Sequence, residues 1–183
     1  DLGYNEGSSR YWDWTYNSPL NGVKALVYDV YAQMPSEFKD NSYGNGALIA
    51  SATDESEFAL SFSPIHKYFN GGWTPSNPFS TTWDRSYRAI TQVHMYLERI
   101  HRIDLSDYEY DPNYQTMVQQ FEIFPNELRF LRAYFYFELV RAYGDVPLVT
   151  TTLTNAQANS VERTPNKDVL KFIINELDHV AEY

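Results

Sequence analysis

The chain has 183 residues, no cysteine and a formal net charge of −10. Without cysteine there is no disulfide framework, thiol nucleophile or cysteine-based zinc site. The excess of 24 Asp and Glu over 14 Lys and Arg argues against binding to nucleic acid or to an anionic membrane surface. No apolar run approaches the ~20 residues that span a bilayer. Aromatic residues make up 17% of the chain, which favours a packed domain over disorder.

The first predicted helix begins after Asn17, with Ser18 as its N-cap and Pro19 as its first residue. Pro35 is expected to end it. Its apolar positions recur at helical spacing. They are Leu20, Val23, Val27, Val30, Tyr31 and Met34.

Residues 36–80 form a long irregular stretch punctuated by Gly, Pro and Asn. Its embedded rings favour an ordered loop, and long ordered loops in compact domains are usually functional. Trp73 follows Asn70 and two glycines, so turns rather than a core element position it. Such a ring can stack on a sugar or a peptide side chain, or it can pack onto its own loop.

The second predicted helix begins after Ser80 or Thr81, with one apolar face that includes both of its histidines. His94, Glu98 and His101 stand at i, i+4 and i+7, a spacing that could hold a metal ion. Packing of both histidines at a helix seam is the favoured interpretation. An acidic break follows at 104–113, which we interpret as a solvated loop rather than a calcium site.

A third helical stretch runs from about 114 to 143, and Pro125 is expected to kink or divide it. Two apolar stripes lie along it, and both are predicted to be buried. The first contains Leu128, Leu131, Phe135, Leu139 and Ala142, and the second Phe130, Tyr134, Phe137 and Arg141. Gly144 is the predicted stop, and 145–150 is predicted to be extended around its proline.

Thr164 and Pro165 are predicted to start a fourth helix, whose apolar periodicity still runs at Tyr183. We therefore expect the apolar face of this helix to need a partner outside the sequence. The sequence predicts a mainly α fold of paired antiparallel helices, of the tetratricopeptide kind, with long irregular loops.

Motifs for catalysis are missing from the sequence. There is no Gly-x-Ser-x-Gly elbow and no phosphate-binding glycine loop. Asp54, Glu55 and Glu57 could form a glycosidase pair, but neighbours in sequence rarely face each other across a substrate. A cap, a turn or a hydrogen bond to a ligand is the expected role of Asp54. No enzyme activity, metal or cofactor is predicted.

Several segments together resemble the SusD/RagB family of surface lipoproteins. The main one is residues 127–149, with Phe130-Leu131-Arg132-Ala133, a run of aromatics and Tyr143-Gly144-Asp145-Val146-Pro147-Leu148. Leu128 departs from it, since the family usually has Ala there. Further matches follow the family order. They are Ala52-Thr53-Asp54-Glu55, Trp83 with Tyr87 and Ile90 before Leu97-Glu98, and Arg163-Thr164-Pro165.

The resemblance covers nearly the whole chain but only about the N-terminal third of a family member. It implies that residues 1–183 are the N-terminal part of a single SusD-like domain. It also implies a non-enzymatic protein on the outer face of the outer membrane, held there only by a lipid anchor. Such a protein would pass glycans, or in some branches peptides, to a SusC-like TonB-dependent transporter. A generic helical-repeat interaction module remains the alternative.

The resemblance also suggests where a ligand binds. Residues 54–83 look like the ligand-facing region of the family, and Asn70 with Trp73 resembles its asparagine-glycine-x-tryptophan turn. We therefore expect Trp73 to stack on the ligand. Asn70 and Asp54 are expected to form hydrogen bonds with its hydroxyl groups.

Overall fold

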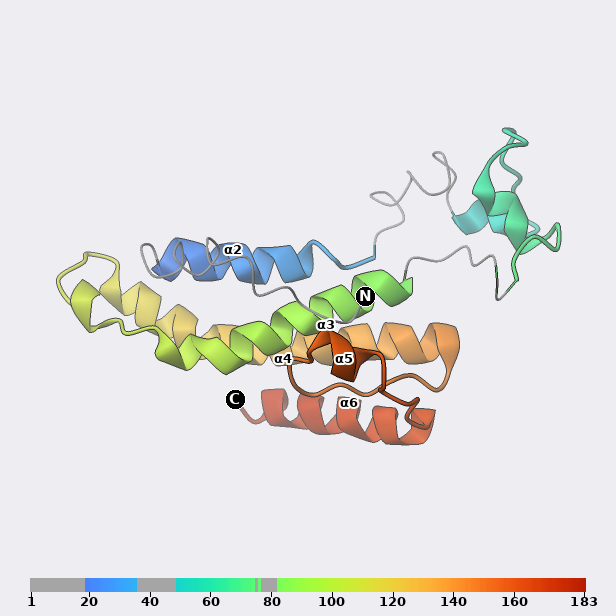
Figure 1. Cartoon of the computed structure of the whole chain (residues 1–183). Coiled ribbons are helices and arrows are strands. Elements are labelled where there is room, and N and C mark those ends of the chain that lie inside the picture. Colours follow the sequence, from blue (N-terminus) through green and yellow to red (C-terminus); the bar gives the residue numbers. More distant parts are fainter. Residues whose placement is uncertain (1–18, 36–48, 75, 77–81) are drawn as a thin grey trace. The chain divides into compact units, whose positions relative to one another are not determined.

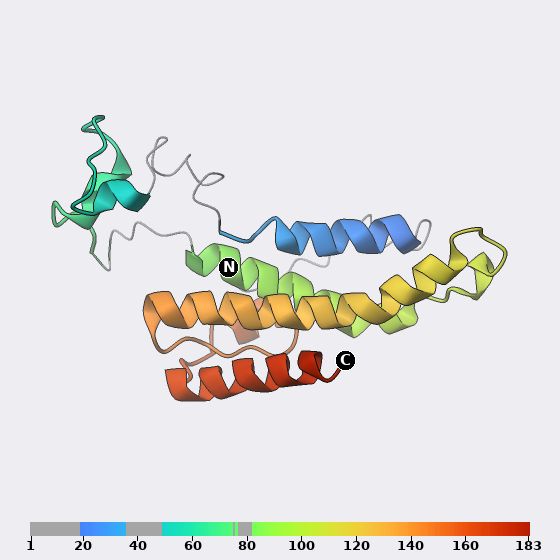
Figure 2. The ribbon, with the colours of Figure 1, turned by 180° about the vertical axis from the view of Figure 1, so that it is seen from behind.

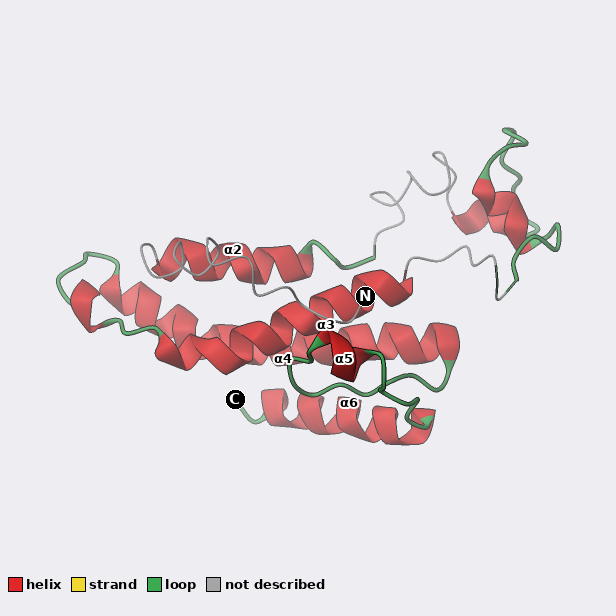
Figure 3. Ribbon diagram, viewed as in Figure 1, coloured by secondary structure: helices red, strands yellow, loops and turns green. Residues whose placement is uncertain are grey.

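The computed structural model describes residues 19–35, 49–74, 76 and 82–183. The chain divides into two compact units (Figure 1). We call residues 19–33 and 83–183 the helical unit, and the described residues between 34 and 82 the loop unit. The described residues contain helices and loops but no strand of a sheet, which confirms the predicted mainly α fold (Figure 3).

Helix α2 (Pro19–Tyr31) begins at the predicted proline. It buries Val23, Val27 and Val30, which share one face. The helix ends four residues before Pro35, in turns. The predicted cap Ser18 lies outside the described residues.

Helix α3 (Thr82–Arg99) is followed by two 3-10 turns, η4 (Ile100–Arg102) and η5 (Ser106–Tyr108). It buries Tyr87, Ile90 and His94, and the burial of His94 is as predicted. The prediction for His101 is wrong: it falls in η4, where the tighter winding turns it out of the helix face, and it is exposed. The predicted caps at 80 and 81 lie outside the described part.

Helix α4 (Tyr114–Tyr143) is continuous through Pro125, so it is not divided. Its first part, drawn in yellow, is inclined to the remainder, as expected for a helix that contains a proline (Figure 2). Gly144 ends the helix as predicted, with φ +70° and its N–H donated to the Val140 carbonyl.

The predicted burial of α4 is correct for one stripe and wrong for the other. Leu128, Leu131 and Phe135 are fully buried, although Ala142 at the end of that stripe is exposed. Phe130 and Phe137 remain 47% and 48% exposed. The physical reason is that α4 packs against α2 and α6, and α3 runs along it, which leaves one face uncovered (Figures 1 and 2).

Helix α6 (Asn166–Ala181) runs antiparallel to α4 and packs against it. Thr164 is not its N-cap, because Pro165 takes that position. The backbone of Thr164 instead forms an antiparallel bridge with Val146. Asp145 supplies the cap, since its Oδ1 accepts the Asn166 N–H at 2.8 Å.

The short helix α5 (Asn155–Ala158) lies in the connection between α4 and α6. A capping box holds it: the Thr154 hydroxyl accepts the Gln157 N–H, and the Gln157 side chain accepts the Thr154 N–H. It has no buried residue.

The described part of the loop unit contains only two short 3-10 helices, η2 (Ile49–Ala52) and η3 (Pro64–Tyr68), which contact each other. Ser63 caps η3 by accepting the Ile65 N–H, and the Ile65 side chain is buried. The irregular character predicted for this stretch is therefore confirmed where the structure describes it.

Candidate functional site

A tight turn at the end of η3 leads into two of the three predicted ligand residues, Asn70 and Trp73. The N–H groups of Phe69 and Asn70 both donate to the His66 carbonyl and end η3. The Asn70 Oδ1 then accepts the Gly72 N–H at 2.8 Å, which is an Asx turn. The chain continues directly into Trp73.

Steric constraints explain why both residues after Asn70 are glycines. Gly71 has φ +75°, a backbone conformation that L side chains rarely adopt. A Cβ on Gly72 would lie 2.8 Å from the Asn70 Oδ1, which would break the turn. The Asn-Gly-Gly sequence thus fixes the direction in which the chain presents Trp73.

The Trp73 ring is half-exposed, at 49%. Its indole meets the edge of the Tyr68 ring, with centroids 4.8 Å apart and an interplanar angle of 71°. Burial raises the pKa of the Tyr68 phenol. Trp73 is therefore partly packed onto its own loop and partly available to a ligand, which combines the two alternatives left open by the sequence.

Other apolar side chains of the loop unit are exposed near η3. The His66 Nε2 lies 3.0 Å from the Leu60 carbonyl oxygen, and the His66 ring meets the Phe69 ring edge-on at 5.1 Å. Leu60 and Phe69 are both substantially exposed around it. Phe62, two residues after Leu60, is 71% exposed. The loop unit therefore offers several apolar contacts in addition to Trp73.

Asp54 is exposed, and it shares no hydrogen bond with Asn70 or Trp73 in the described part of the chain. It lies in a turn after η2, where the Thr53 hydroxyl donates to the Ala50 carbonyl. Glu55 and Glu57 are exposed as well. The structure therefore joins Asn70 and Trp73 in one turn and leaves the role of Asp54 as a prediction.

The histidines and acids considered as metal ligands do not form a site. The described residues contain no group of three His, Asp or Glu side chains suited to a metal ion. Glu98 instead accepts the Thr152 N–H at 2.8 Å. Of the acidic break, Asp104 accepts the Ser106 N–H and Asp111 the Asn113 N–H, so both shape local turns.

His94 is a buried core side chain, only 2% exposed, and its Nε2 has no hydrogen-bond partner. Burial, followed by the nearby Arg132 charge, lowers the pKa of His94 to about 3, although a backbone hydrogen bond to Thr151 opposes this. The imidazole is therefore neutral at physiological pH.

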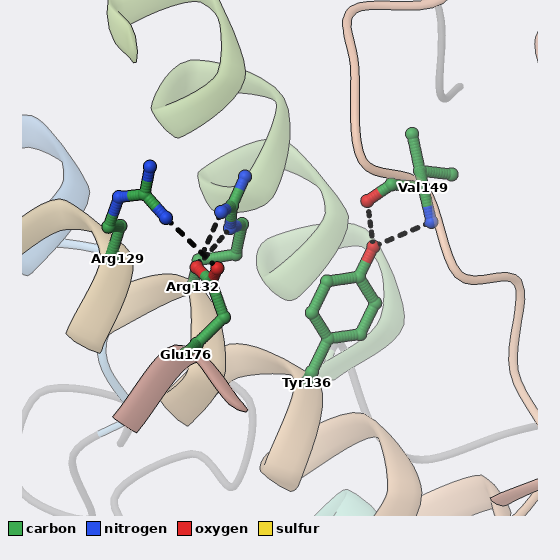
Figure 4. Close-up of polar contacts among 5 residues, drawn as sticks. All are labelled: Arg129, Arg132, Tyr136, Val149 and Glu176. Carbon is green, nitrogen blue, oxygen red and sulfur yellow. Dashed lines mark hydrogen bonds and ion pairs between the residues drawn. The ribbon is translucent and has the colours of Figure 1, made fainter. Parts of the chain in front are cut away.

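A buried ion pair that the sequence analysis did not predict joins α4 to α6 (Figure 4). The Glu176 Oε2 accepts hydrogen bonds from the Nε, at 3.0 Å, and the Nη2 of Arg132, while Arg129 Nη1 approaches Oε1 at 3.3 Å. Arg132 and Glu176 are both 7% exposed. The burial of Glu176 could have been predicted from the sequence. It lies seven residues after Val169 and three after Ile173, so it shares the buried face of α6 with them.

Two tyrosine hydroxyls hold the extended segment that follows α4. The Tyr136 hydroxyl donates to the Val149 carbonyl at 2.6 Å and accepts the Val149 N–H at 2.8 Å (Figure 4). The Tyr87 hydroxyl donates to the Pro147 carbonyl at 2.8 Å. Burial raises the pKa of both phenols, so both stay protonated.

None of the described helices is both long and apolar enough to cross a membrane.

The fold is similar to that of several solved proteins. A SusD-like protein from Bacteroides fragilis matches with a TM-score of 0.64 and 23% identity, over 92% of this chain and 30% of its own. A SusD-like carbohydrate-binding protein from the same organism matches with a TM-score of 0.65 and 24% identity, over 91% of this chain and 32% of its own. A laminarin-binding SusD-like protein matches with a TM-score of 0.62 and 22% identity, over 89% of this chain and 33% of its own.

The chain thus spans about a third of the length of these structures. The likeness confirms the predicted SusD-like arrangement of tetratricopeptide-like helices. Comparison with curated proteins gave no match. The model of a SusD-like family, described as starch-binding and associating with the outer membrane, matches residues 13–182. Since this match covers nearly the whole sequence, the chain belongs to the SusD-like family.

Proposed function

We propose that the chain is part of a non-enzymatic cell-surface protein that captures oligo- or polysaccharides. In this proposal Trp73 stacks on the apolar face of a sugar ring, and Asn70 and Asp54 offer hydrogen bonds to its hydroxyl groups. The protein then delivers the glycan to a SusC-like TonB-dependent outer-membrane transporter.

The observation that supports glycan binding most directly is that Trp73 is partly exposed and held in place by its own loop. Its ring is half-exposed and is held by the Tyr68 edge and by the Asn70 turn. A ring fixed before binding loses little conformational entropy when a ligand stacks on it. The Asn70 Oδ1 is occupied within the turn, so its NH₂ group is the part that would meet a ligand.

The test is glycan binding by calorimetry, with starch and laminarin as first probes. Starch is chosen because the family is described as starch-binding, and laminarin because one structure of similar fold is that of a laminarin-binding protein. Trp73→Ala should weaken binding about tenfold, because a stacked ring contributes about 1–2 kcal/mol. Trp73→Tyr should retain most of the affinity. Phe62→Ala is the matched control, since it removes another exposed ring of the loop unit. If Trp73→Ala binds every glycan as tightly as the unchanged chain, the stacking role is wrong.

Peptide binding is the second candidate, supported by the exposed apolar side chains Leu60, Phe62 and Phe69. Peptide side chains fill such surfaces, whereas sugars need polar groups beside the stacking ring. A glycan array and a peptide library screened against the same protein distinguish the two. Binding of proteins alone, unaffected by Trp73→Ala, would instead favour a generic helical-repeat interaction module.

We also propose that residues 1–183 are the N-terminal part of a single larger SusD-like domain. The structures it resembles are about three times as long. The α6 side chains Leu170, Ile174 and Leu177 are substantially exposed at i, i+4 and i+7, so they form an uncovered apolar stripe. Ile174→Lys should lower the Tm of a longer protein that contains this chain and leave that of the 183 residues unchanged. Equal effects on both would contradict the proposal.

The outer-membrane location is proposed from the description of the family. A lipid anchor is the only contact with the membrane in this proposal. Globomycin treatment of producing cells, which blocks maturation of bacterial lipoproteins, should abolish surface display. Co-purification with a TonB-dependent transporter tests the proposed partner.

A further inference from the structure

We propose that Asn70 is a site of spontaneous deamidation, and that its conversion to isoaspartate releases the turn that holds Trp73. The candidate reactive groups are the side-chain amide carbon of Asn70 and the backbone nitrogen of Gly71. The co-reactant is water, and no enzyme is needed.

The backbone nitrogen of Gly71 is free to react. In the described part of the chain its N–H makes no hydrogen bond, unlike those of Phe69, Asn70 and Gly72 around it. Gly71 is exposed, and a glycine offers no Cβ to hinder the approach of the neighbouring side chain.

The Asn70 amide is oriented and polarised by the turn. Its Oδ1 accepts the Gly72 N–H at 2.8 Å, which holds the side chain beside the backbone of Gly71. Negative charge develops on Oδ1 when a nucleophile adds to the amide carbon. The Gly72 N–H is already aimed at that oxygen, so it stabilises the addition intermediate in the manner of an oxyanion hole.

The reaction balances as a hydrolysis. The Gly71 nitrogen loses its proton and bonds to the Asn70 Cγ, and the Cγ–Nδ2 bond breaks with release of ammonia. Water then opens the resulting five-membered succinimide. Cleavage at Cγ gives aspartate, and cleavage at the main-chain carbonyl gives isoaspartate. The net change is loss of ammonia and gain of water.

The two products affect the turn differently. Aspartate keeps an oxygen where Oδ1 was, so the hydrogen bond from the Gly72 N–H can persist. Isoaspartate routes the main chain through Cγ and adds one carbon to the backbone. The Asx turn cannot form in that chain, and Trp73 is displaced from the Tyr68 edge.

The chain contains a matched internal control. Asn21 and Gly22 form the same dipeptide within α2, where Gly22 is buried. That helix must open locally before the Gly22 nitrogen can reach the amide, and opening has a free-energy cost. The pair at 45 and 46 lies outside the described residues.

The experiment is peptide mapping by mass spectrometry after incubation of the chain at mildly alkaline pH. Asn70 should convert to a mixture of aspartate and isoaspartate at least about tenfold faster than Asn21, as expected for a barrier lower by about 1.4 kcal/mol. Asn70→Gln, which would need a six-membered ring, should stay unmodified at position 70. An unchanged Asn70 amide, or equal rates at Asn70 and Asn21, overturns the proposal. The readout needs no ligand, so its failure is distinguishable from failure of glycan binding.

Discussion

The Tyr136 hydroxyl forms two hydrogen bonds with the backbone of a single residue, Val149. Tyr136→Phe removes both and leaves a buried N–H and carbonyl without partners, which costs about 1–3 kcal/mol of unfolding free energy. Urea denaturation measures this loss. Tyr134→Phe is the control, because that ring is only partly buried. Equal stability of the two variants would show that Tyr136 acts through its ring alone.

His94 makes the stability of the helical unit depend on pH. Its pKa is lowered to about 3 in the folded chain, below its ordinary value of 6.5, so only the unfolded chain takes up this proton as the pH falls. The stabilisation is therefore complete above pH 6.5 and is lost progressively towards pH 3.

Between pH 6.5 and 5 the loss from His94 should be about 1.5 kcal/mol, in a range above that in which most carboxylates titrate. Denaturation at a series of pH values measures it. His94→Gln should flatten this dependence, whatever it does to stability at neutral pH. The same pH slope in the variant would assign the effect to other groups.

At the scale of elements, the start of α6 depends on a residue that precedes it by 21 positions, Asp145. Asp145→Ala should destabilise the helical unit by about 0.5–2 kcal/mol, the usual effect of losing an N-cap. Asp145→Asn keeps an acceptor oxygen and should lose much less. Thermal unfolding followed by circular dichroism compares them, and equal losses would argue against the capping role.

The helices were predictable because their apolar residues recur at helical spacing, as in Val23, Val27 and Val30 of α2. Local sequence did not reveal which apolar face remains uncovered. Phe130 and Phe137 share the pattern of a core stripe, and their exposure depends on which helices pack beside α4. Thr164 was misassigned for a similar reason, since its pairing with Val146 is a contact between distant residues.

The turn of the candidate site was predictable because Asn70, Gly71 and Gly72 act on their immediate neighbours. The contact between Trp73 and Tyr68 required the structure, as did the finding that Asp54 shares no hydrogen bond with Asn70 in the described residues. The ion pair of Arg132 with Glu176 joins residues 44 positions apart, which no local pattern specifies.

At the scale of the whole molecule, the net charge of −10 bears on ligand choice. The electrostatic field of this negative charge does not act on a neutral glycan. The affinity for such a glycan should therefore change less than about twofold between ~50 and ~500 mM NaCl. An anionic polysaccharide should bind weakly at low salt and better at high salt. Calorimetry at several salt concentrations tests both expectations, and strong salt dependence for a neutral glycan would contradict the stacking mode.

The bridge between Val146 and Thr164 also makes the intervening connection a suitable place for a label. Both ends of the segment 147–163 are fixed. The bridge holds them together, and the hydroxyls of two tyrosines bind the backbone at Pro147 and Val149. The outer part of this segment carries α5, none of whose residues is buried. Lengthening a loop whose ends are already held costs little entropy, so an epitope or fluorophore-binding peptide inserted after Ser160 should leave α4 and α6 packed. The proposed surface display could then be tested on living cells with the Trp73 turn unchanged.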